Sequence, residues 1–289
     1  MFYSPLRYPG GKGKLEPFME LLIKQTGHIG GTYIEPFAGG AGIALELLEK
    51  NIVNEIVIND LDKGIYSFWK AITLETDKFI NDIRTTPLTI AEWNRQKAIL
   101  ANNCKYSYEL GFATFYLNRT NRSGIIKGGV IGGVEQSGNW KMDARFNRNE
   151  LIERILKIAR RKRDIHIYNK DANSFVQNYL PRYQENAFVY FDPPYFGKGR
   201  QLYLNFFSYD DHVRIERMIN NQVNCDWVIT YDDVQDIADI YQNHILRRFD
   251  LNYSAAVKRK ASEIIIFKHL DMIPDVEQLD ERGICVNLR

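Results

Sequence analysis

The segment Asp192-Pro193-Pro194-Tyr195 places a carboxylate and an aromatic ring on either side of two prolines. Proline fixes the backbone φ angle and has no N–H group, so the pair forms a rigid turn whose carbonyl oxygens can accept hydrogen bonds. The carboxylate of Asp192 and the carbonyl of Pro193 can therefore accept both hydrogens of an amino group and localise the lone pair on its nitrogen. An ordinary turn after a strand is the alternative interpretation.

The residues before this segment indicate how it is positioned. Ala187 to Phe191 is a short run of apolar and aromatic residues, which is typical of a buried strand. In open α/β sheets, ligands bind at the carboxyl ends of the strands. We therefore predict that Asp192, Pro193 and Tyr195 form a catalytic group at such an edge.

A second segment, Thr32 to Gly42, reads as a short strand followed by a glycine-rich turn and then a helix. The next predicted strand, Asn54 to Asn59, is followed by Asp60. An acid at this place can accept hydrogen bonds from both ribose hydroxyls of an adenosine-containing cofactor. The glycine spacing is not G-x-G-x-x-G, which argues against a nicotinamide cofactor.

The amino-terminal segment from Ser4 to Lys14 contains two glycines and two lysines before a helical pattern. It is only superficially similar to a phosphate-binding loop. No Ser or Thr follows the lysine, the glycine spacing differs, and no apolar strand precedes it.

The order of the remaining elements predicts the fold class. Further strands are expected at residues 164–171, 226–232, 245–251 and 263–268, and helices are expected between most of them. The pattern favours an α/β protein with a doubly wound, Rossmann-like sheet and an inserted, mainly helical domain that carries a β-hairpin. The predicted catalytic domain covers residues 1–62 and 164–289, and the insertion covers residues 63–163.

Composition bounds the class of protein. The 289 residues are 45% hydrophobic and 26% charged, and no stretch has the apolar length of a membrane span. The start of the chain does not read as a signal peptide, so we expect a cytoplasmic protein. The three cysteines and five histidines have no metal-ligand spacing, so we predict no metal.

Positive charge is concentrated in the middle of the chain. Residues 116–163 contain 12 Lys and Arg against 4 Asp and Glu, although the net charge of the whole protein is only +2. Such a distribution is typical of a surface that faces a polyanion. We predict DNA contacts from this segment, whose glycine-rich part (residues 128–133) reads as a hairpin. The alternatives are a flexible surface hairpin and, for residues 160–163, a solvated helix end.

Six short motifs occur in a characteristic order: Tyr8-Pro-Gly-Gly-Lys12, Glu35 to Gly42, Asn59-Asp60, Asn118-Arg119, Lys170-Asp171 and Asp192 to Tyr195. Together they resemble the Dam-like (alpha-group) DNA adenine-N6 methyltransferases, over about residues 4–268. In that family a target-recognition domain lies between the first cofactor motif and Asp-Pro-Pro-Tyr. The recognition hairpin of this chain departs from the family pattern, so the target sequence does not transfer.

The resemblance implies S-adenosyl-L-methionine as the methyl donor and double-stranded DNA as the partner, with a cognate restriction endonuclease as a further candidate partner. It implies that a target adenine is flipped out of the duplex and stacked on Tyr195. Asp60 would bind the ribose and Asp171 the adenine of the cofactor, with helix capping as the alternative role for both. The implied cofactor-binding residues are Tyr8, Lys12, Glu35, Phe37, Ala38, Gly39, Gly40, Asp60, Asp171, Ala172, Asp192 and Pro194. The candidate DNA-binding residues are Arg119, Asn121, Arg122, Lys127, Lys258, Arg259 and Lys260.

Two other functions remain open from the sequence. The first is a methyltransferase that acts on RNA or on a protein amide, although such enzymes often carry Asn in place of Asp192. The second is a catalytically silent DNA-binding module of the same fold. The sequence does not determine the recognition sequence or the oligomeric state.

Overall fold

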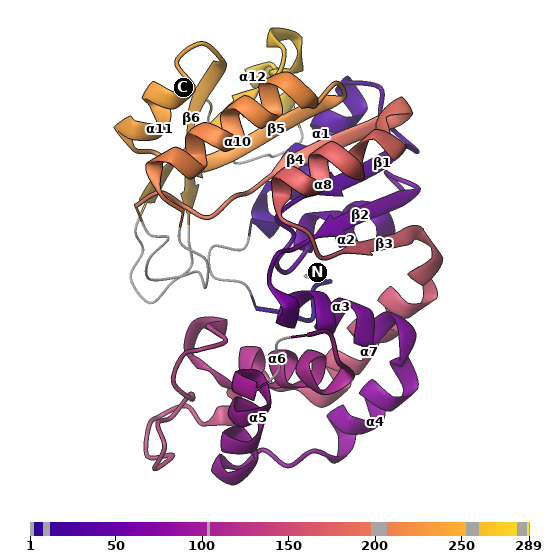
Figure 1. The fold of residues 1–289 in the computed structure, drawn as a ribbon, viewed down its shortest axis with the longest axis vertical. Coiled ribbons are helices and arrows are strands. Elements are labelled where there is room, and N and C mark those ends of the chain that lie inside the picture. Colours follow the sequence, from indigo (N-terminus) through magenta and orange to yellow (C-terminus); the bar gives the residue numbers. More distant parts are fainter. Residues whose placement is uncertain are drawn as a thin grey trace.

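The computed structural model describes residues 3–7, 12–102, 105–197, 207–252, 260–281 and 288. Helices and strands alternate through most of these ranges (Figure 1). The strands are β1 (Thr32–Glu35), β2 (Glu55–Asn59), β3 (Ile165–Tyr168), β4 (Ala187–Phe191), β5 (Asp226–Asp232), β6 (Ile245–Asn252) and β7 (Lys260–Phe267). The helices are α1 (Glu16–Gln25), α2 (Gly42–Glu49), α3 (Lys63–Leu74), α4 (Thr76–Thr85), α5 (Ile90–Asn102), α6 (Tyr108–Thr120), α7 (Arg148–Arg160), α8 (Ala172–Asn178), α10 (Tyr209–Gln222), α11 (Gln235–Ile240) and α12 (Val276–Glu281). None of the helices in the described ranges combines the length and apolar character of a membrane span.

Within the described residues, the strands form one seven-stranded sheet in the order β3-β2-β1-β4-β5-β7-β6. Strands β1 to β5 are parallel, and β7 runs antiparallel to both of its neighbours. The order reverses between β1 and β4, as in a doubly wound fold. The predicted α/β fold is therefore confirmed, and β4 and β5 have the bounds that the sequence predicts.

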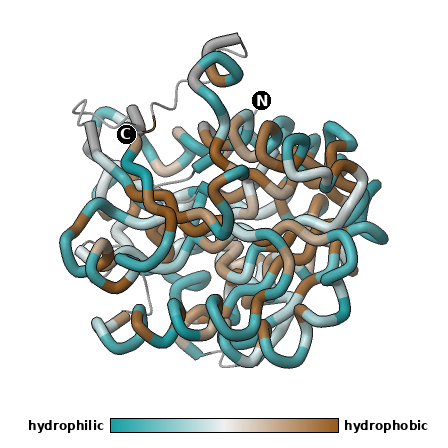
Figure 2. The backbone as a smooth tube through the Cα atoms, turned by 90° about the horizontal axis from the view of Figure 1, so that it is seen from above, coloured by the Kyte–Doolittle hydropathy of each residue, from teal (hydrophilic) through white to brown (hydrophobic). Residues whose placement is uncertain are grey.

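Alternating side chains of the central strands point into two hydrophobic cores on opposite faces of the sheet. Ile34 of β1 lies beside Val57 of β2 and Val189 of β4, and all three pack toward α8 and α10. Their neighbours Tyr33 and Phe188 face the opposite core, which contains α1 and α2. Figure 2 shows the hydrophobic stretches of the tube running through the interior, with hydrophilic stretches at the margin. Burial on both faces explains why these strands read as continuous apolar runs.

The inserted helices α3 to α7 lie together below the sheet in Figure 1. Helices α3 and α6 approach closely at Gly111, where an added Cβ atom would be 2.4 Å from the carbonyl oxygen of Ser67. Phe68 and Phe115 stack across this contact with their ring centroids 5.9 Å apart. The apolar side chains of these helices join the same core as α1 and α2. The helical insertion is therefore packed continuously onto the sheet, and its predicted domain boundaries stay a prediction.

Residues 121–147, which we call the recognition loop, do not form the predicted hairpin of two strands. In the described part of the chain, this loop has a single antiparallel bridge, between Asn121 and Val130, which is followed by turns. Gly132 and Gly133 have φ angles of 86° and 77°, which a continuing strand cannot adopt. The loop is instead held by Gln136, whose side-chain amide donates to the carbonyl oxygens of Ile131 and Gly133.

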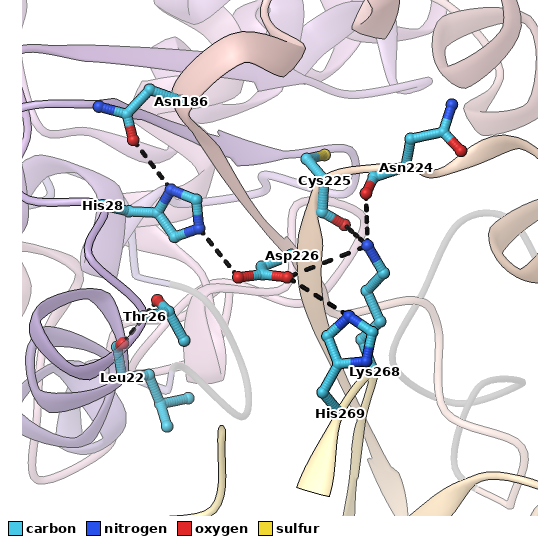
Figure 3. Close-up of polar contacts among 9 residues, drawn as sticks. All are labelled: Leu22, Thr26, His28, Asn186, Asn224, Cys225, Asp226, Lys268 and His269. Carbon is cyan, nitrogen blue, oxygen red and sulfur yellow. Dashed lines mark hydrogen bonds and ion pairs between the residues drawn. The ribbon is translucent and has the colours of Figure 1, made fainter. Parts of the chain in front are cut away.

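His28, which precedes β1, links the starts of β1, β4 and β5 at the amino-terminal edge of the sheet (Figure 3). Its Nδ1 lies 2.9 Å from Oδ1 of Asn186, just before β4, and its Nε2 lies 3.0 Å from Oδ2 of Asp226, which begins β5. Lys268 and His269 approach the other carboxylate oxygen of Asp226 at 3.9 and 3.8 Å. These contacts hold the strands together at the edge opposite the predicted site. We therefore expect substitutions in this cluster to change the stability of the fold.

We expect His28→Ala to destabilise the protein more in mild acid than in mild base. The hydrogen bond to Asp226 raises the pKa of His28, which has an ordinary value of 6.5. A raised folded-state pKa stabilises the fold below the unfolded pKa, and this contribution is lost as pH rises through the folded value. Urea unfolding should show a loss of about 1 kcal/mol at pH 6 and a smaller loss at pH 8.5.

His166→Ala is the matched control for His28→Ala, because its ion pair with Glu55 spans 3.4 Å and is more exposed. We expect a smaller effect from this control at both pH values. If the cost of His28→Ala is the same at pH 6 and pH 8.5, the pair with Asp226 does not contribute through its charge.

Candidate active site

The carboxyl ends of the parallel strands bring the predicted acids to one edge of the sheet. Glu35 ends β1, Asp60 follows β2, Asp171 follows β3, and Asp192 follows β4. Because the strands are parallel, their carboxyl ends meet at the same edge. The structure therefore gathers side chains that are far apart in the sequence.

Asn59, the last residue of β2, ties three of the loops at this edge together. Its Nδ2 donates to the carbonyl oxygens of Pro36 and Lys170 at 2.9 and 3.0 Å, and its Oδ1 accepts from the backbone N–H of Lys170 at 2.9 Å. Its side chain is buried. Because a buried amide with all these bonds is costly to displace, Asn59 sets the relative positions of the loops after β1 and β3.

The turn after β1 has an unusual backbone. Gly39 and Ala41 both have left-handed φ angles, of 46° and 44°. Asp60 holds the turn, because its Oδ2 accepts from the backbone N–H of Gly39 at 2.8 Å while its Oδ1 accepts from that of Asp62. Burial raises the pKa of Asp60 to about 7. An acid with such a pKa is typical of a ligand-binding site.

Glu35, at the end of β1, is a buried acid of this edge. Its Oε1 accepts from the backbone N–H of Ala44 in α2 at 3.2 Å. Burial raises the pKa of Glu35 to about 8, and the nearby Asp192 acts in the same direction. A cationic ligand group beside Glu35 would restore its negative charge.

Lys12 lies at the centre of a buried polar network. Its Nζ is 3.0 Å from Oδ1 of Asp192 and 3.0 Å from Oε2 of Glu263, and it donates to Oγ1 of Thr230 at 2.5 Å. Burial alone would lower the pKa of Lys12, but the two carboxylates outweigh it and the pKa is raised. Lys12 is therefore a fixed positive charge beside the predicted catalytic acid.

Hydrogen bonds from the neighbouring strands fix the segment around Asp192. Thr230 of β5 donates to Oδ1 of Asp192 at 3.2 Å, and Tyr195 donates to Oε1 of Glu263 at 2.9 Å. Asp232 accepts from the backbone N–H groups of Phe196 and Gly197 at 2.9 and 2.8 Å. The side chain of Asp192 keeps 27% of its surface exposed. The segment is thus preorganised while its carboxylate stays accessible.

A cavity of about 470 Å³ lies at this edge. Its volume is in the range of small-molecule sites. The predicted site residues that line it are Lys12, Glu35, Phe37, Ala38, Gly40, Arg119 and Asp192. The cavity therefore joins the turn after β1 to the segment that begins at Asp192.

Arg119 of α6 brings positive charge into the cavity. It is only 7% exposed, and its Nε has no hydrogen-bond partner among the described residues. Burial lowers its pKa to about 9, and the nearby Arg154 and Arg7 act in the same direction. A buried guanidinium group whose Nε has no partner among the described residues is suited to bind an anionic group of a ligand.

A comparison with known protein families agrees with this geometry. Residues 8–253 match the family of D12 class N6 adenine-specific DNA methyltransferases. The match spans the glycine-rich turn, the helical insertion and the Asp-Pro-Pro-Tyr segment. The chain belongs to this family. It is an adenine-specific DNA methyltransferase, its substrate is DNA, and it requires a methyl donor.

Individual relatives are more distant. The type II methyltransferase M.MjaIII of Methanocaldococcus jannaschii is 24% identical over 259 residues, which cover 77% of this chain and 85% of that protein. Among solved structures, the rRNA methyltransferase aviRa of Streptomyces viridochromogenes overlaps with a TM-score of 0.36 at 11% identity, covering 90% of this chain and 85% of that one. A Legionella pneumophila protein gives 0.36 at 12% identity, covering 96% and 90%. We draw no conclusion from structural overlaps this weak.

Several predicted residues of the methyltransferase lie at the edge but outside the cavity lining. Asp171 is exposed and caps α8, since its Oδ1 accepts from the backbone N–H of Ser174 at 2.9 Å, and Ala172 begins that helix. Gly39 is bound by Asp60 in the turn after β1. Pro193 is buried and Pro194 is half-buried. The capping role that the sequence leaves open for Asp171 is thus present.

The predicted DNA-binding residues do not form one group. Arg122 and Lys127 are exposed on the recognition loop. Asn121 is buried, and its side chain bonds to Trp93 and to the carbonyl oxygens of Ile125 and Ile126. The expectation that Asn121 contacts a phosphate is therefore corrected, because these bonds use its amide to shape the loop. Tyr8, Lys258 and Arg259 lie outside the described residues, as does the side chain of Lys260.

Two site residues were missed by sequence reasoning. Thr230 lies inside an apolar strand, and Glu263 precedes the run Ile264 to Ile266. The only signal in the sequence is a polar residue within or next to an otherwise apolar strand. That signal does not reveal the partner, because Lys12 lies 218 residues from Thr230.

Proposed function

We propose that this methyltransferase takes its methyl group from S-adenosyl-L-methionine, bound in the cavity between the turn after β1 and Asp192. The residues present fit that molecule. The cavity is lined by Arg119 and by the buried carboxylate of Glu35. The Nε atom of Arg119 has no hydrogen-bond partner among the described residues. An amino acid with a cationic sulfur needs this pairing of opposite charges.

We assign the donor-binding roles by position. Glu35 faces the cationic part of the donor, and Phe37, Ala38 and Gly40 line the space beside it. Asp60 accepts from the ribose hydroxyls, and Asp171 keeps a carboxylate oxygen for the adenine amino group while it caps α8. Bound S-adenosyl-L-methionine supplies an electrophilic methyl group on a positively charged sulfur.

The acceptor chemistry rests on Asp192 and Pro193. The lone pair of adenine N6 is conjugated into the ring, which makes N6 a poor nucleophile. If Asp192 and the carbonyl oxygen of Pro193 accept its two hydrogens, the lone pair localises on nitrogen. Asp192 is suited to this role because Lys12 and Thr230 hold it while part of its carboxylate stays exposed in the cavity. This placement of Asp192 is the observation that carries the proposal.

The recognition loop is the proposed DNA surface. It presents the exposed cations Arg122 and Lys127, and the side chain of Trp140 is 73% exposed. Cations of this kind bind phosphates, and exposed aromatic rings stack on bases. Because N6 is out of reach inside a stacked duplex, the target adenine must be extruded. The enzyme would act at a short specific sequence, with a cognate restriction endonuclease as its proposed partner.

We expect Arg122→Ala to weaken DNA binding in proportion to the loss of one phosphate contact. The slope of log affinity against log salt should become shallower by about 1 in filter binding to unmethylated DNA. Arg84→Ala, at the exposed end of α4, is the control and should leave the slope unchanged. An unchanged slope in Arg122→Ala would remove this residue from the DNA surface.

We expect the affinity for S-adenosyl-L-methionine to fall as pH falls below 7. Burial raises the pKa of Asp60 to about 7, and the ionised carboxylate is the better acceptor for hydroxyl groups. Calorimetric titration should show about tenfold weaker binding at pH 5.5 than at pH 8. Asp60→Asn should bind weakly and with a smaller pH dependence than the wild type, because Glu35, whose pKa burial raises to about 8, keeps its own contribution. Glu55→Gln, at the opposite end of β2, should behave like the wild type, and a pH-independent wild type would contradict the role of Asp60.

The proposed function is tested by incubating the purified protein with tritiated S-adenosyl-L-methionine and unmethylated genomic DNA, followed by nucleoside analysis. RNA and whole-cell protein serve as parallel substrates. We expect label in N6-methyladenine of DNA, and sequencing of the product then identifies the site. Label only in RNA or protein would overturn the substrate, and the absence of any transfer despite DNA binding would indicate a silent binding module.

A further inference from the structure

Glu263 connects the antiparallel edge of the sheet to the catalytic segment. It lies on β7 opposite Asp232 of β5, and only 1% of its surface is exposed. Its Oε1 accepts from the Tyr195 hydroxyl at 2.9 Å, and its Oε2 is 3.0 Å from Nζ of Lys12. Both contacts are groups of the site itself. A buried carboxylate is costly, so its placement against these groups needs a reason beyond packing.

Two carboxylates share the positive charge of Lys12. Its ammonium group lies 3.0 Å from the carboxylates of both Asp192 and Glu263, which gives two acids for one cation among these three residues. The hydroxyls of Thr230 and Tyr190, which lie 2.8 Å apart, are uncharged members of the network, as is the hydroxyl of Tyr195. Glu35 from β1 adds a further acid toward Asp192. Two carboxylates that share one cation compete for its positive charge, so each affects how strongly the other is held.

Methyl transfer to adenine releases a proton. The N6 lone pair forms the bond to the methyl carbon while the bond between that carbon and its leaving group breaks, and the leaving group keeps the electron pair. N6 then carries a positive charge and two hydrogens, one of which must leave as a proton to give N6-methyladenine. Asp192 is the nearest candidate acceptor under the role proposed above. Burial raises the pKa of Asp192, Lys12 opposes this, and Glu263 supports it.

We propose that Glu263 is a positioning residue for methyl transfer: it holds the Lys12 ammonium and the Tyr195 hydroxyl beside Asp192, and its negative charge keeps Asp192 able to accept the proton released from N6. The inference rests on the function proposed for Asp192. Without Glu263, Lys12 would pair with Asp192 alone and would hold that carboxylate more firmly in its ionised form.

The test is the pH dependence of single-turnover methyl transfer from tritiated S-adenosyl-L-methionine to unmethylated genomic DNA. For Glu263→Gln we expect a rate about tenfold or more below the wild type at pH 7.5, with the acid limb of the profile moved to lower pH. Affinities for the donor and for DNA should stay within about twofold, since the expected loss belongs to the bound state. Glu263→Asp, which keeps the charge, should restore the position of the acid limb.

Glu16→Gln is the matched control, because Glu16 is also a buried carboxylate bound to a lysine, with Nζ of Lys50 at 2.8 Å, but outside the cavity. It should lower thermal stability without moving the pH profile. If Glu263→Gln lowers the rate and the stability but leaves the acid limb in place, Glu263 is structural only and the proposal is overturned. If Glu263→Gln does not fold, the same charge is removed in the Lys12→Met background, where Lys12→Met/Glu263→Gln should have its acid limb at lower pH than Lys12→Met alone, and an unmoved acid limb overturns the proposal. A wild-type protein that methylates no DNA would instead overturn the proposed function.

Discussion

Asp192→Asn should reduce single-turnover methyl transfer by about 10³-fold while the affinity for S-adenosyl-L-methionine changes little. The amide has nearly the shape of the carboxylate, but it has one acceptor oxygen instead of two and no negative charge. It can neither localise the N6 lone pair as well nor accept the released proton. Lys12 keeps Glu263 as a partner at 3.0 Å, so the fold should survive. Rapid quench with tritiated donor measures the rate, and calorimetry measures the affinity.

The control for this variant is Asp236→Asn, on the exposed side of α11, which should match the wild type in both measurements. Two outcomes would contradict the role of Asp192. A rate within tenfold of the wild type would show that its carboxylate is not needed for the chemistry. Loss of folding or of donor binding would reassign Asp192 to structure.

Lys12→Met should affect both stability and activity. The Lys12 and Glu263 side chains are each 2% exposed, so the substitution removes an ammonium group that lies 3.0 Å from a buried carboxylate. Removing one partner of a buried ion pair costs about 3–5 kcal/mol. One of the two carboxylates must then take up a proton to remain buried, so the loss should grow between pH 5 and pH 8. Urea unfolding at these two pH values measures it.

The double variant Lys12→Met/Glu263→Gln separates the two effects of Lys12. Removing the charge of Glu263 relieves the uncompensated carboxylate, so most of the lost stability should return. Methyl transfer should stay low, because Asp192 would lack the ammonium group that holds its carboxylate at 3.0 Å. If the double variant recovers activity as well, Lys12 acts only by keeping the site folded.

Local patterns in the sequence were sufficient where the chemistry is local. The strand before Asp192 is confirmed with its predicted bounds, because an apolar run closed by two prolines has few other conformations. The acids at the carboxyl ends of β1 and β2, Glu35 and Asp60, are likewise at the expected edge, since parallel strands must end together. The prediction of a glycine-rich hairpin was wrong because Gly132 and Gly133 have left-handed φ angles, which interrupt a strand. The sequence does not show which glycines adopt a left-handed φ angle.

The family, the parallel sheet and the edge at which Asp60 and Asp192 lie could be predicted from the sequence, because each depends on residues that are neighbours along the chain. Which side chains share a buried network became visible in the folded chain alone. Lys12, Thr230 and Glu263 meet because β7 inserts between β5 and β6, an order that hydrophobic patterns do not encode. The folded chain also shows that Asn121 is buried while Arg122 next to it is exposed. Contacts between distant segments depend on how the whole chain packs, and residue type alone does not specify them.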